Sequence, residues 1–298
     1  MEAGQADITV CLLFETEGEQ MEFLSNLHTH SCFSDGRDTP EEIVREALRK
    51  GFISLGFSDH SPTPYFSDCN MPEERTEAYR REIRRLQKRY AGQIAIFLGI
   101  EQDANSAPAP RQLYDYRIGS VHDLLGPDGQ VYTVDWDLPH FEDGLRELSG
   151  GDIRDFCGRY YAAYRQMLQT HRPEIAGHMD LLKKLNQEGR FFREEDTWYL
   201  EMAEQTLEAV RRTGAVLEVN TGGIARGGCR EPYPSAHLLQ IACQKGIPVT
   251  LSADAHRKED LDFYFRESIA ILRQVGYRQV KRWETDGWTD VSLNSISG

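Results

Sequence analysis

The sequence predicts an α/β fold with parallel strands, and two observations support this prediction. Short apolar segments alternate with amphipathic segments of helical period along almost the whole chain, which is the order typical of parallel α/β folds. The length of 298 residues and the hydrophobic fraction of 40% suit a single α/β barrel with a large core. Because the sequence contains no internal repeat, low-complexity tract or linker, we expect one domain.

The expected strands are short apolar runs, each followed by a helical or loop segment. They occupy residues 23–27, 53–57, 94–100, 117–121, 174–176, 215–219 and 247–251. Since a helical connection returns the chain to the same end of a sheet, neighbouring strands are expected to run parallel. One segment interrupts the alternation: the turn sequence of residues 126–130 precedes apolar residues 131–134, which predicts a short hairpin.

The expected helices are defined by their start and stop signals. Thr39 is an N-cap whose capping box is completed by Glu42, and Pro40 occupies the first turn. Gly51 then ends this helix. Pro72 begins a long charged helix that reaches about residue 90. Amphipathic patterns predict further helices at residues 152–171, 195–212, 235–245 and 260–275.

The composition excludes several classes of protein. The formal charge is -14 and no Lys/Arg-rich run is present, which disfavours binding to nucleic acid. No apolar run approaches the ~20 residues that cross a bilayer, and no basic residue precedes Arg37, whereas a secretory signal needs one. Six cysteines without a Cys-x-x-Cys pair argue against a disulfide scaffold. We expect a cytoplasmic protein without nucleic-acid or membrane partners, and the oligomeric state is open.

Histidines and carboxylates recur where the expected strands end, which is the face on which parallel barrels carry their sites. These residues are His28, His30, Asp35, His60, Glu101, His122, His178, Asp254 and His256. Because alternate residues of an extended chain point the same way, His28 and His30 can present two donors to one cavity. The same spacing applies to Asp254 and His256. His140, His171 and His237 lie off this pattern and are expected to be ordinary surface or core residues.

The chemistry of these nine side chains predicts a metal site. Imidazole and carboxylate groups suit Zn, Mn or Fe, and nine of them exceed the four ligands of a tetrahedral zinc. We therefore expect two or three divalent metal ions that share bridging carboxylates and keep coordination positions open for water and substrate.

The segments around these residues resemble those of the PHP (polymerase and histidinol phosphatase) metal-dependent phosphoesterase superfamily. The matching segments are residues 28–30, 56–60, 99–101, 120–122, 177–180 and 252–256. The resemblance implies a distorted (β/α)7, TIM-like barrel with a metal site at the C-terminal ends of its strands. It implies a first metal bound by His28, His30, Glu101 and Asp254, a second bound by Glu101, His122 and His178, and a third bound by Asp35, His60 and His256.

Residues 218–235 resemble the histidinol-phosphatase branch of this superfamily. There the segment carries a phosphate-binding arginine, here Arg226, and Lys183 and Lys184 are expected to add to phosphate binding. The resemblance implies hydrolysis of a small phosphorylated metabolite, L-histidinol phosphate, in histidine biosynthesis. The expected nucleophile is a metal-bridging hydroxide held by His28, His30, Glu101, His122, His178 and Asp254. Since family chains usually start shortly before the first His-x-His, we expect residues 1–20 to be an appendage to a barrel domain of residues 21–298.

Three other functions stay open at this point. The first is another PHP phosphoesterase that acts on nucleotides or phosphotyrosine; the acidic composition disfavours long nucleic acid but is compatible with a mononucleotide. The second is an amidohydrolase-type barrel that cleaves C–N or C–O bonds, against which Glu101, His122 and Arg226 favour phosphate. The third is a non-catalytic metal-binding module, which the complete ligand set disfavours.

Overall fold

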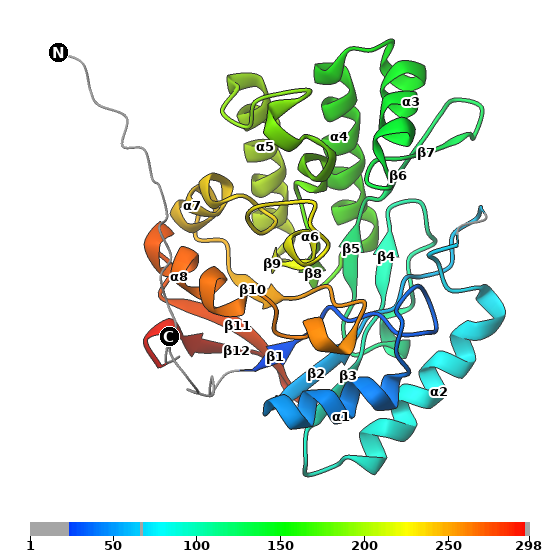
Figure 1. The fold of residues 1–298 in the computed structure, drawn as a ribbon, viewed down its shortest axis with the longest axis vertical. Helices are drawn as coiled ribbons and strands as arrows, with labels where there is room; N and C mark the ends of the chain where they lie inside the picture. The colour runs from blue at the N-terminus through cyan, green and yellow to red at the C-terminus, as the bar shows by residue number, and fades with distance from the viewer. Residues whose placement is uncertain (1–23, 66–67, 296–298) are drawn as a thin grey trace.

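The computed structural model describes residues 24–65 and 68–295, and the expected appendage at residues 1–20 lies outside the described residues. Within this part of the chain, eight short parallel strands form two sheets (Figure 1). One sheet has the order β1-β2-β3 and the other has the order β10-β9-β8-β5-β4. The strands are β1 (Ser25–Asn26), β2 (Ser54–Phe57), β3 (Ala95–Leu98), β4 (Glu101–Asp103), β5 (Ile118–Ser120), β8 (Ile175–Ala176), β9 (Val216–Asn220) and β10 (Val249–Ser252). The predicted α/β fold is confirmed.

Strand β3 lies within the segment that was expected as a strand at residues 94–100, and β4 begins directly after that segment, at Glu101. β3 pairs with β2 and β4 pairs with β5, so the chain passes from one sheet to the other between Leu98 and Glu101. The expected strand is therefore confirmed as β3, whereas β4 was not predicted. The passage is made at Gly99, where a Cβ atom would lie 2.2 Å from Cζ of the buried Tyr116 ring, so the absence of a side chain lets Tyr116 pack directly on the backbone.

Isolated bridges link the two sheets at two junctions. Thr29, beyond β1, bridges to Ala255, beyond β10. His60, beyond β2, bridges to Glu101 at the start of β4, and the backbone N–H of Ser61 donates to the carbonyl of Glu101 at 2.8 Å. Both junctions therefore lie at the carboxyl ends of strands, where they bring distant segments of the chain together.

Helices surround the strands (Figure 1). They are α1 (Pro40–Lys50), α2 (Glu73–Arg89), α3 (Leu138–Ser149), α4 (Ile153–His171), α5 (Thr197–Thr213), α6 (Gly222–Ala225), α7 (Ala236–Gln244) and α8 (Phe265–Val275). The predicted capping box of α1 is present, with Thr39 and Glu42 bonded reciprocally, and Gly51 ends the helix with a left-handed φ of 81°. The predicted ranges of α2, α4, α5 and α7 are confirmed to within two residues at each end.

Other elements differ from the prediction. Helix α8 begins at Phe265 rather than near residue 260, because Lys258–Asp260 forms a separate 3-10 turn and Tyr264 has a left-handed φ of 62°. Helix α3 was not predicted, although Asp137 caps its first turn through the backbone N–H of His140. The hairpin expected near residues 126–134 is confirmed as β6 (Asp123–Leu125) and β7 (Val131–Thr133).

A second hairpin, β11 (Gln279–Glu284) and β12 (Gly287–Ser292), was also not predicted. Its Trp283 and Trp288 rings pack edge to face, with centroids 4.9 Å apart. Both rings pack against a buried apolar cluster of Leu27, Phe97, Tyr116, Ile118 and Ile175. The hairpin therefore covers apolar surface contributed by both sheets. None of the helices in the described ranges has the length and apolar character that a membrane crossing requires.

Gly99→Ala should destabilise the protein, because the added Cβ would overlap the buried Tyr116 ring. Overpacking of this kind usually costs about 1–3 kcal/mol, so thermal denaturation followed by circular dichroism should show a Tm lowered by a few degrees. Gly158→Ala is the control, since a Cβ at this position in α4 meets its nearest neighbour, Cε of Met202, at 3.6 Å. Equal Tm values for the two variants would contradict the tight packing at Gly99.

Candidate metal centre

The nine candidate ligands lie together at the carboxyl ends of the strands. Ligand atoms from these residues form four overlapping groups, each with all atoms within 4.8 Å of one another. The groups are His30, Asp35, His60 and His256; His28, His30 and Asp254; His28, Glu101 and His178; and His60, Glu101 and His122. Every expected ligand belongs to at least one group. The expected set of Glu101, His122 and His178 is divided, since the two histidines fall in separate groups that share Glu101.

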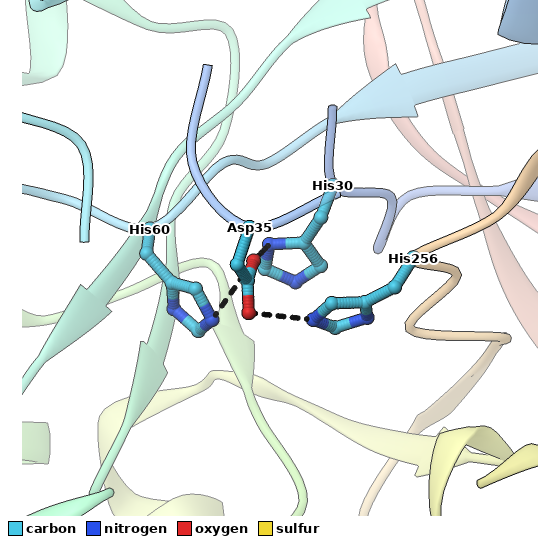
Figure 2. A group of neighbouring side chains, drawn as sticks. All are labelled: His30, Asp35, His60 and His256. Carbon is cyan, nitrogen blue, oxygen red and sulfur yellow. Dashed lines mark hydrogen bonds and ion pairs between the residues drawn. The ribbon is translucent and has the colours of Figure 1, made fainter. Parts of the chain in front are cut away.

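Asp35 lies between three imidazole rings (Figure 2). Its Oδ2 is 3.1 Å from Nε2 of His256, and its Oδ1 is 3.6 Å from Nδ1 of His30 and 3.8 Å from Nε2 of His60. The loop that carries Asp35 is fixed by the buried Asp59 carboxylate, which accepts hydrogen bonds from the backbone and hydroxyl groups of Ser31 and Ser34. The geometry of this group therefore depends on a carboxylate that is not itself a candidate ligand.

Glu101 is fully buried, and its two oxygens face different histidines. Oε2 lies 2.9 Å from His60 Nδ1, 3.2 Å from His28 Nε2 and 3.5 Å from His30 Nε2. Oε1 lies 2.9 Å from His178 Nε2 and 3.5 Å from His122 Nε2. A carboxylate whose oxygens face separate sets of nitrogen donors has the arrangement of a bridging ligand.

The two carboxylate oxygens of Asp254 also have different partners. Oδ1 faces the histidines, at 3.2 Å from Nε2 of His30 and 3.6 Å from Nε2 of His28. Oδ2 accepts a hydrogen bond from Nη2 of Arg226 at 2.8 Å, and the Asp254 carbonyl accepts one from Nη1 at 2.9 Å. Asp254 has a left-handed φ of 49°, an uncommon conformation for a residue with a side chain. The backbone here is thus arranged so that one residue faces both the histidines and the guanidinium.

Glu218 orients the candidate ligand His28, a contact that was not predicted from the sequence. Its Oε1 is 2.6 Å from Nδ1 of His28, and its Oε2 accepts the backbone N–H of His178 at 2.8 Å. A hydrogen bond from Nδ1–H leaves the Nε2 lone pair of His28 directed at the cluster. Glu218 is a charged residue in an otherwise mostly apolar strand, β9, and this pattern was the sequence signal that could have identified it. The structure shows that Glu218 is fully buried.

Asp103 lies beside His122 as Glu218 lies beside His28. Its Oδ2 accepts the backbone N–H of His122 at 3.0 Å and lies 3.6 Å from Nδ1 of the ring. Asp103 follows Glu101 by two residues in β4, so one short strand supplies both a candidate bridging carboxylate and a carboxylate that fixes a neighbouring ring.

Burial and neighbouring charge shift the pKa values of the cluster in opposite directions. Burial alone lowers the pKa of His122, but the carboxylates of Glu101 and Asp103 outweigh it and raise the pKa to about 10. Burial likewise opposes protonation of His28, yet Glu218, Glu101 and Asp254 raise its pKa well above the ordinary value. Burial and the charges of His256 and His60 lower the pKa of His30 to about 3. The neighbouring carboxylates thus favour the protonated forms of His28 and His122, whereas burial and the adjacent imidazoles disfavour that of His30.

Several buried atoms of the cluster have no well-directed hydrogen bond among the described residues. They are Nε2 of His28, both ring nitrogens of His30, Oε2 of Glu101 and Nδ1 of His178. A buried polar atom without a partner costs about 1–3 kcal/mol, and a divalent cation would supply partners for several of them at once. Imidazole nitrogens and carboxylate oxygens form a donor set for Zn, Mn or Fe. The cluster therefore fits more than one divalent metal ion.

The two lysines that were expected near phosphate have different surroundings. Lys183 is buried, with Nζ 3.1 Å from Oδ2 of Asp180, 3.5 Å from Oε1 of Glu231 and donating to the Pro232 carbonyl at 2.7 Å. The expectation that Lys183 binds phosphate is corrected, because these partners hold its ammonium group away from the cavity beside the cluster. Lys184 does line that cavity, with Nζ 3.0 Å from Oδ2 of Asp135.

A cavity of about 660 Å³ opens beside the cluster. Its wall includes candidate ligands such as Asp35, His60 and Asp254, together with Arg226. Residues of hairpin β6–β7, the start of α3 and the loop after β2 also line it. This volume suits a small metabolite, which could contact the metal ligands and the guanidinium at the same time.

Comparison with known proteins identifies relatives over most of the chain. The PHP domain family matches residues 26–222. A protein named probable histidinol-phosphatase from Deinococcus radiodurans is 33% identical over 268 residues, covering 86% of this chain and 94% of the relative. The histidinol-phosphatase of Bacillus subtilis is 28% identical over 260 residues, covering 80% and 95%. A structure of histidinol phosphate phosphatase from Lactococcus lactis, complexed with zinc, L-histidinol and phosphate, has 20% identity and a TM-score of 0.65, covering 92% of this chain and 98% of that one.

Glu218→Gln should weaken metal binding, because a neutral amide holds the Nδ1–H of His28 less strongly than a carboxylate does. Loss of such a partner typically lowers metal affinity or activity by about 10–100-fold. Competition with a chromophoric chelator and elemental analysis of the purified variant measure the effect. Glu208→Gln on the exposed face of α5 is the control, since Glu208 pairs with Arg211 on the surface. Wild-type metal affinity in Glu218→Gln would contradict the orienting role.

Metal binding should release protons and should strengthen as the pH rises. A histidine ligates through the lone pair that a proton otherwise occupies. With a pKa of about 10, His122 carries a proton at neutral pH, whereas His30, with a pKa of about 3, does not. Calorimetric titration of metal-free protein with Zn²⁺ at pH 7, in two buffers of different ionisation enthalpy, should therefore detect at least one released proton. His122→Gln should release fewer, and no release from the wild type would refute the raised pKa.

Proposed function

Because this chain belongs to the PHP domain family, we propose that it is a metal-dependent phosphomonoesterase that hydrolyses L-histidinol phosphate. The observation that carries this proposal is the placement of Arg226 beside a cluster of nine metal-type ligands, in a cavity of metabolite size. The relatives named as histidinol-phosphatases support the substrate, since this chain spans 94% and 95% of their lengths. Hydrolysis would give L-histidinol and phosphate, the two molecules bound in the Lactococcus lactis structure.

The same family relationship supports a finer description of the fold. We infer that the two parallel sheets together correspond to a distorted seven-stranded barrel, with β3 and β4 as two halves of one strand. The isolated bridges between the sheets, at Thr29 with Ala255 and at His60 with Glu101, support this inference, and so does the TM-score of 0.65 to the Lactococcus lactis enzyme.

The proposed ligands for two or three divalent ions are the nine residues of the cluster. They are His28, His30, Asp35, His60, Glu101, His122, His178, Asp254 and His256. We propose Glu101 as the bridging ligand, because each of its oxygens faces a different set of histidines. When bound, such ions polarise a phosphoryl group and lower the pKa of coordinated water toward neutrality. Zn, Mn and Fe all suit this donor set, and zinc is the metal in the Lactococcus lactis structure.

The residues around the ligands would position the substrate phosphate. Arg226 presents a planar guanidinium that can donate two parallel hydrogen bonds to phosphoryl oxygens. Asp254 holds this guanidinium at 2.8 Å, so its orientation is set before substrate arrives. Lys184 would add a second positive charge once the phosphate competes with Asp135 for its ammonium group. Both cations stabilise the negative charge on the phosphoryl oxygens during transfer.

A substrate panel on metal-loaded protein tests the proposal. Release of inorganic phosphate should be fastest, as kcat/KM, with L-histidinol phosphate, and much slower with a 3′,5′-bisphosphonucleotide or a phosphotyrosine peptide. Exhaustive chelation should abolish the activity and added Zn²⁺ or Mn²⁺ should restore it. Glu101→Gln is the inactive control, because it removes the proposed bridging carboxylate. Full activity after chelation, or a preference for either rival substrate, would contradict the proposed function.

A further inference from the structure

The cavity is lined by carboxylates that the proposed reaction at phosphorus does not use. Besides the candidate ligands Asp35 and Asp254, five aspartates line the cavity, namely Asp68, Asp103, Asp123, Asp135 and Asp143. Carboxylates of this kind repel a phosphate ester and attract a cationic group elsewhere in the same substrate. The question is which of these carboxylates is available to bind a cation.

Most of these carboxylates already have a partner. Asp135 pairs with Lys184 at 3.0 Å and Asp143 pairs with Arg146 on α3. Asp103 accepts a hydrogen bond from the backbone N–H of His122 and lies beside its ring. Asp68 is exposed at the surface, where water screens its charge. This leaves Asp123, which is partly buried and forms no ion pair with any lysine, arginine or histidine of residues 24–65 and 68–295.

Asp123 is held in place by neutral groups close to the candidate ligands. Its Oδ2 accepts the Tyr65 hydroxyl at 2.9 Å, and its backbone carbonyl accepts the Asn105 amide at 3.0 Å. The same Tyr65 hydroxyl lies 3.3 Å from Oδ1 of Asp103, and Oδ2 of Asp103 lies 3.6 Å from the ring of His122. One chain of contacts thus connects the Asp123 carboxylate to a candidate metal ligand and fixes its position in the cavity.

We propose that Asp123, positioned by Tyr65, binds the ammonium group of the substrate and selects phosphomonoesters of amino alcohols. The inference rests on the proposed function and names the group that recognises the organic half of the substrate. A partly buried carboxylate without a counter-charge is unfavourable, and a substrate ammonium supplies both the charge and a charge-assisted hydrogen bond. Because Asp123 and His122 line the same cavity, the proposal places the substrate ammonium, two carbons from the ester oxygen, at Asp123 and the phosphate at the cluster.

The test compares substrates with and without an ammonium group. The panel is L-histidinol phosphate, O-phosphoethanolamine and phenyl phosphate, assayed as kcat/KM on metal-loaded wild type, Asp123→Asn and Tyr65→Phe. A hydrogen bond to a charged group contributes about 1.5–3 kcal/mol. The ratio of either ammonium substrate to phenyl phosphate should therefore fall by about 10–100-fold in Asp123→Asn, with a smaller fall in Tyr65→Phe.

Asp128→Asn is the matched control, since Asp128 lies in the turn of the same hairpin and does not line the cavity. It removes the same charge and should leave the ratio unchanged. Metal content and Tm are measured for each variant, so that loss of the metal site is recognised directly. An equal loss on all three substrates, or an unchanged ratio in Asp123→Asn, would overturn the inference.

The two proposals can fail separately. If the wild type does not hydrolyse L-histidinol phosphate but Asp123→Asn still lowers the kcat/KM ratio of O-phosphoethanolamine to phenyl phosphate, the proposed substrate is wrong. The proposed ammonium site would then stand. If wild type prefers L-histidinol phosphate and Asp123→Asn keeps that preference, the proposed function stands and the ammonium site is wrong.

Discussion

The structure is organised around a single constraint, the burial of the Glu101 carboxylate among five imidazole rings. Those rings belong to His28, His30, His60, His122 and His178, all within 3.5 Å of one of its oxygens. A buried charge persists only with close counter-charges or a metal. The chain passes from one sheet to the other between β3 and β4, and Glu101 lies at this point. It pairs with Ile118 of β5 in one sheet and forms an isolated bridge to His60, which follows β2 of the other sheet.

The geometry of the cluster is set by buried carboxylates outside the candidate ligands. Glu218 fixes the ring of His28, Asp103 fixes His122, and Asp59 fixes the loop that carries Asp35. Each of these carboxylates accepts several hydrogen bonds from distant parts of the chain. Buried networks whose members are satisfied hold side chains in one arrangement. The positions of the candidate ligands are therefore supported by hydrogen bonds from residues that are not themselves ligands.

The cavity has a charge distribution that the net charge of -14 does not reveal. Arg226 and Lys184 line the cavity, which suits phosphate, and Asp123 lines it without an ion pair to any lysine, arginine or histidine among the described residues. A ligand with a phosphate at one end and a cation near it would match this distribution. Asp135 and Asp254 hold the two cations in ion pairs, with Lys184 and Arg226 respectively, whereas Asp123 has no such partner among the described residues.

The sequence by itself determined the alternation of strands and helices, the capped helix α1 and the strand ends that carry the candidate ligands, because these depend on local periodicity and residue chemistry. The separation of β3 from β4 at Gly99 and the position of hairpin β11–β12 depend on contacts with a distant residue, Tyr116. The different surroundings of Lys183 and Lys184 could not be predicted from the sequence either. They are adjacent and chemically identical, yet consecutive residues of a 3-10 turn point about 120° apart. Only the tertiary structure decided that one pairs with Asp180 in the interior and the other faces the cavity.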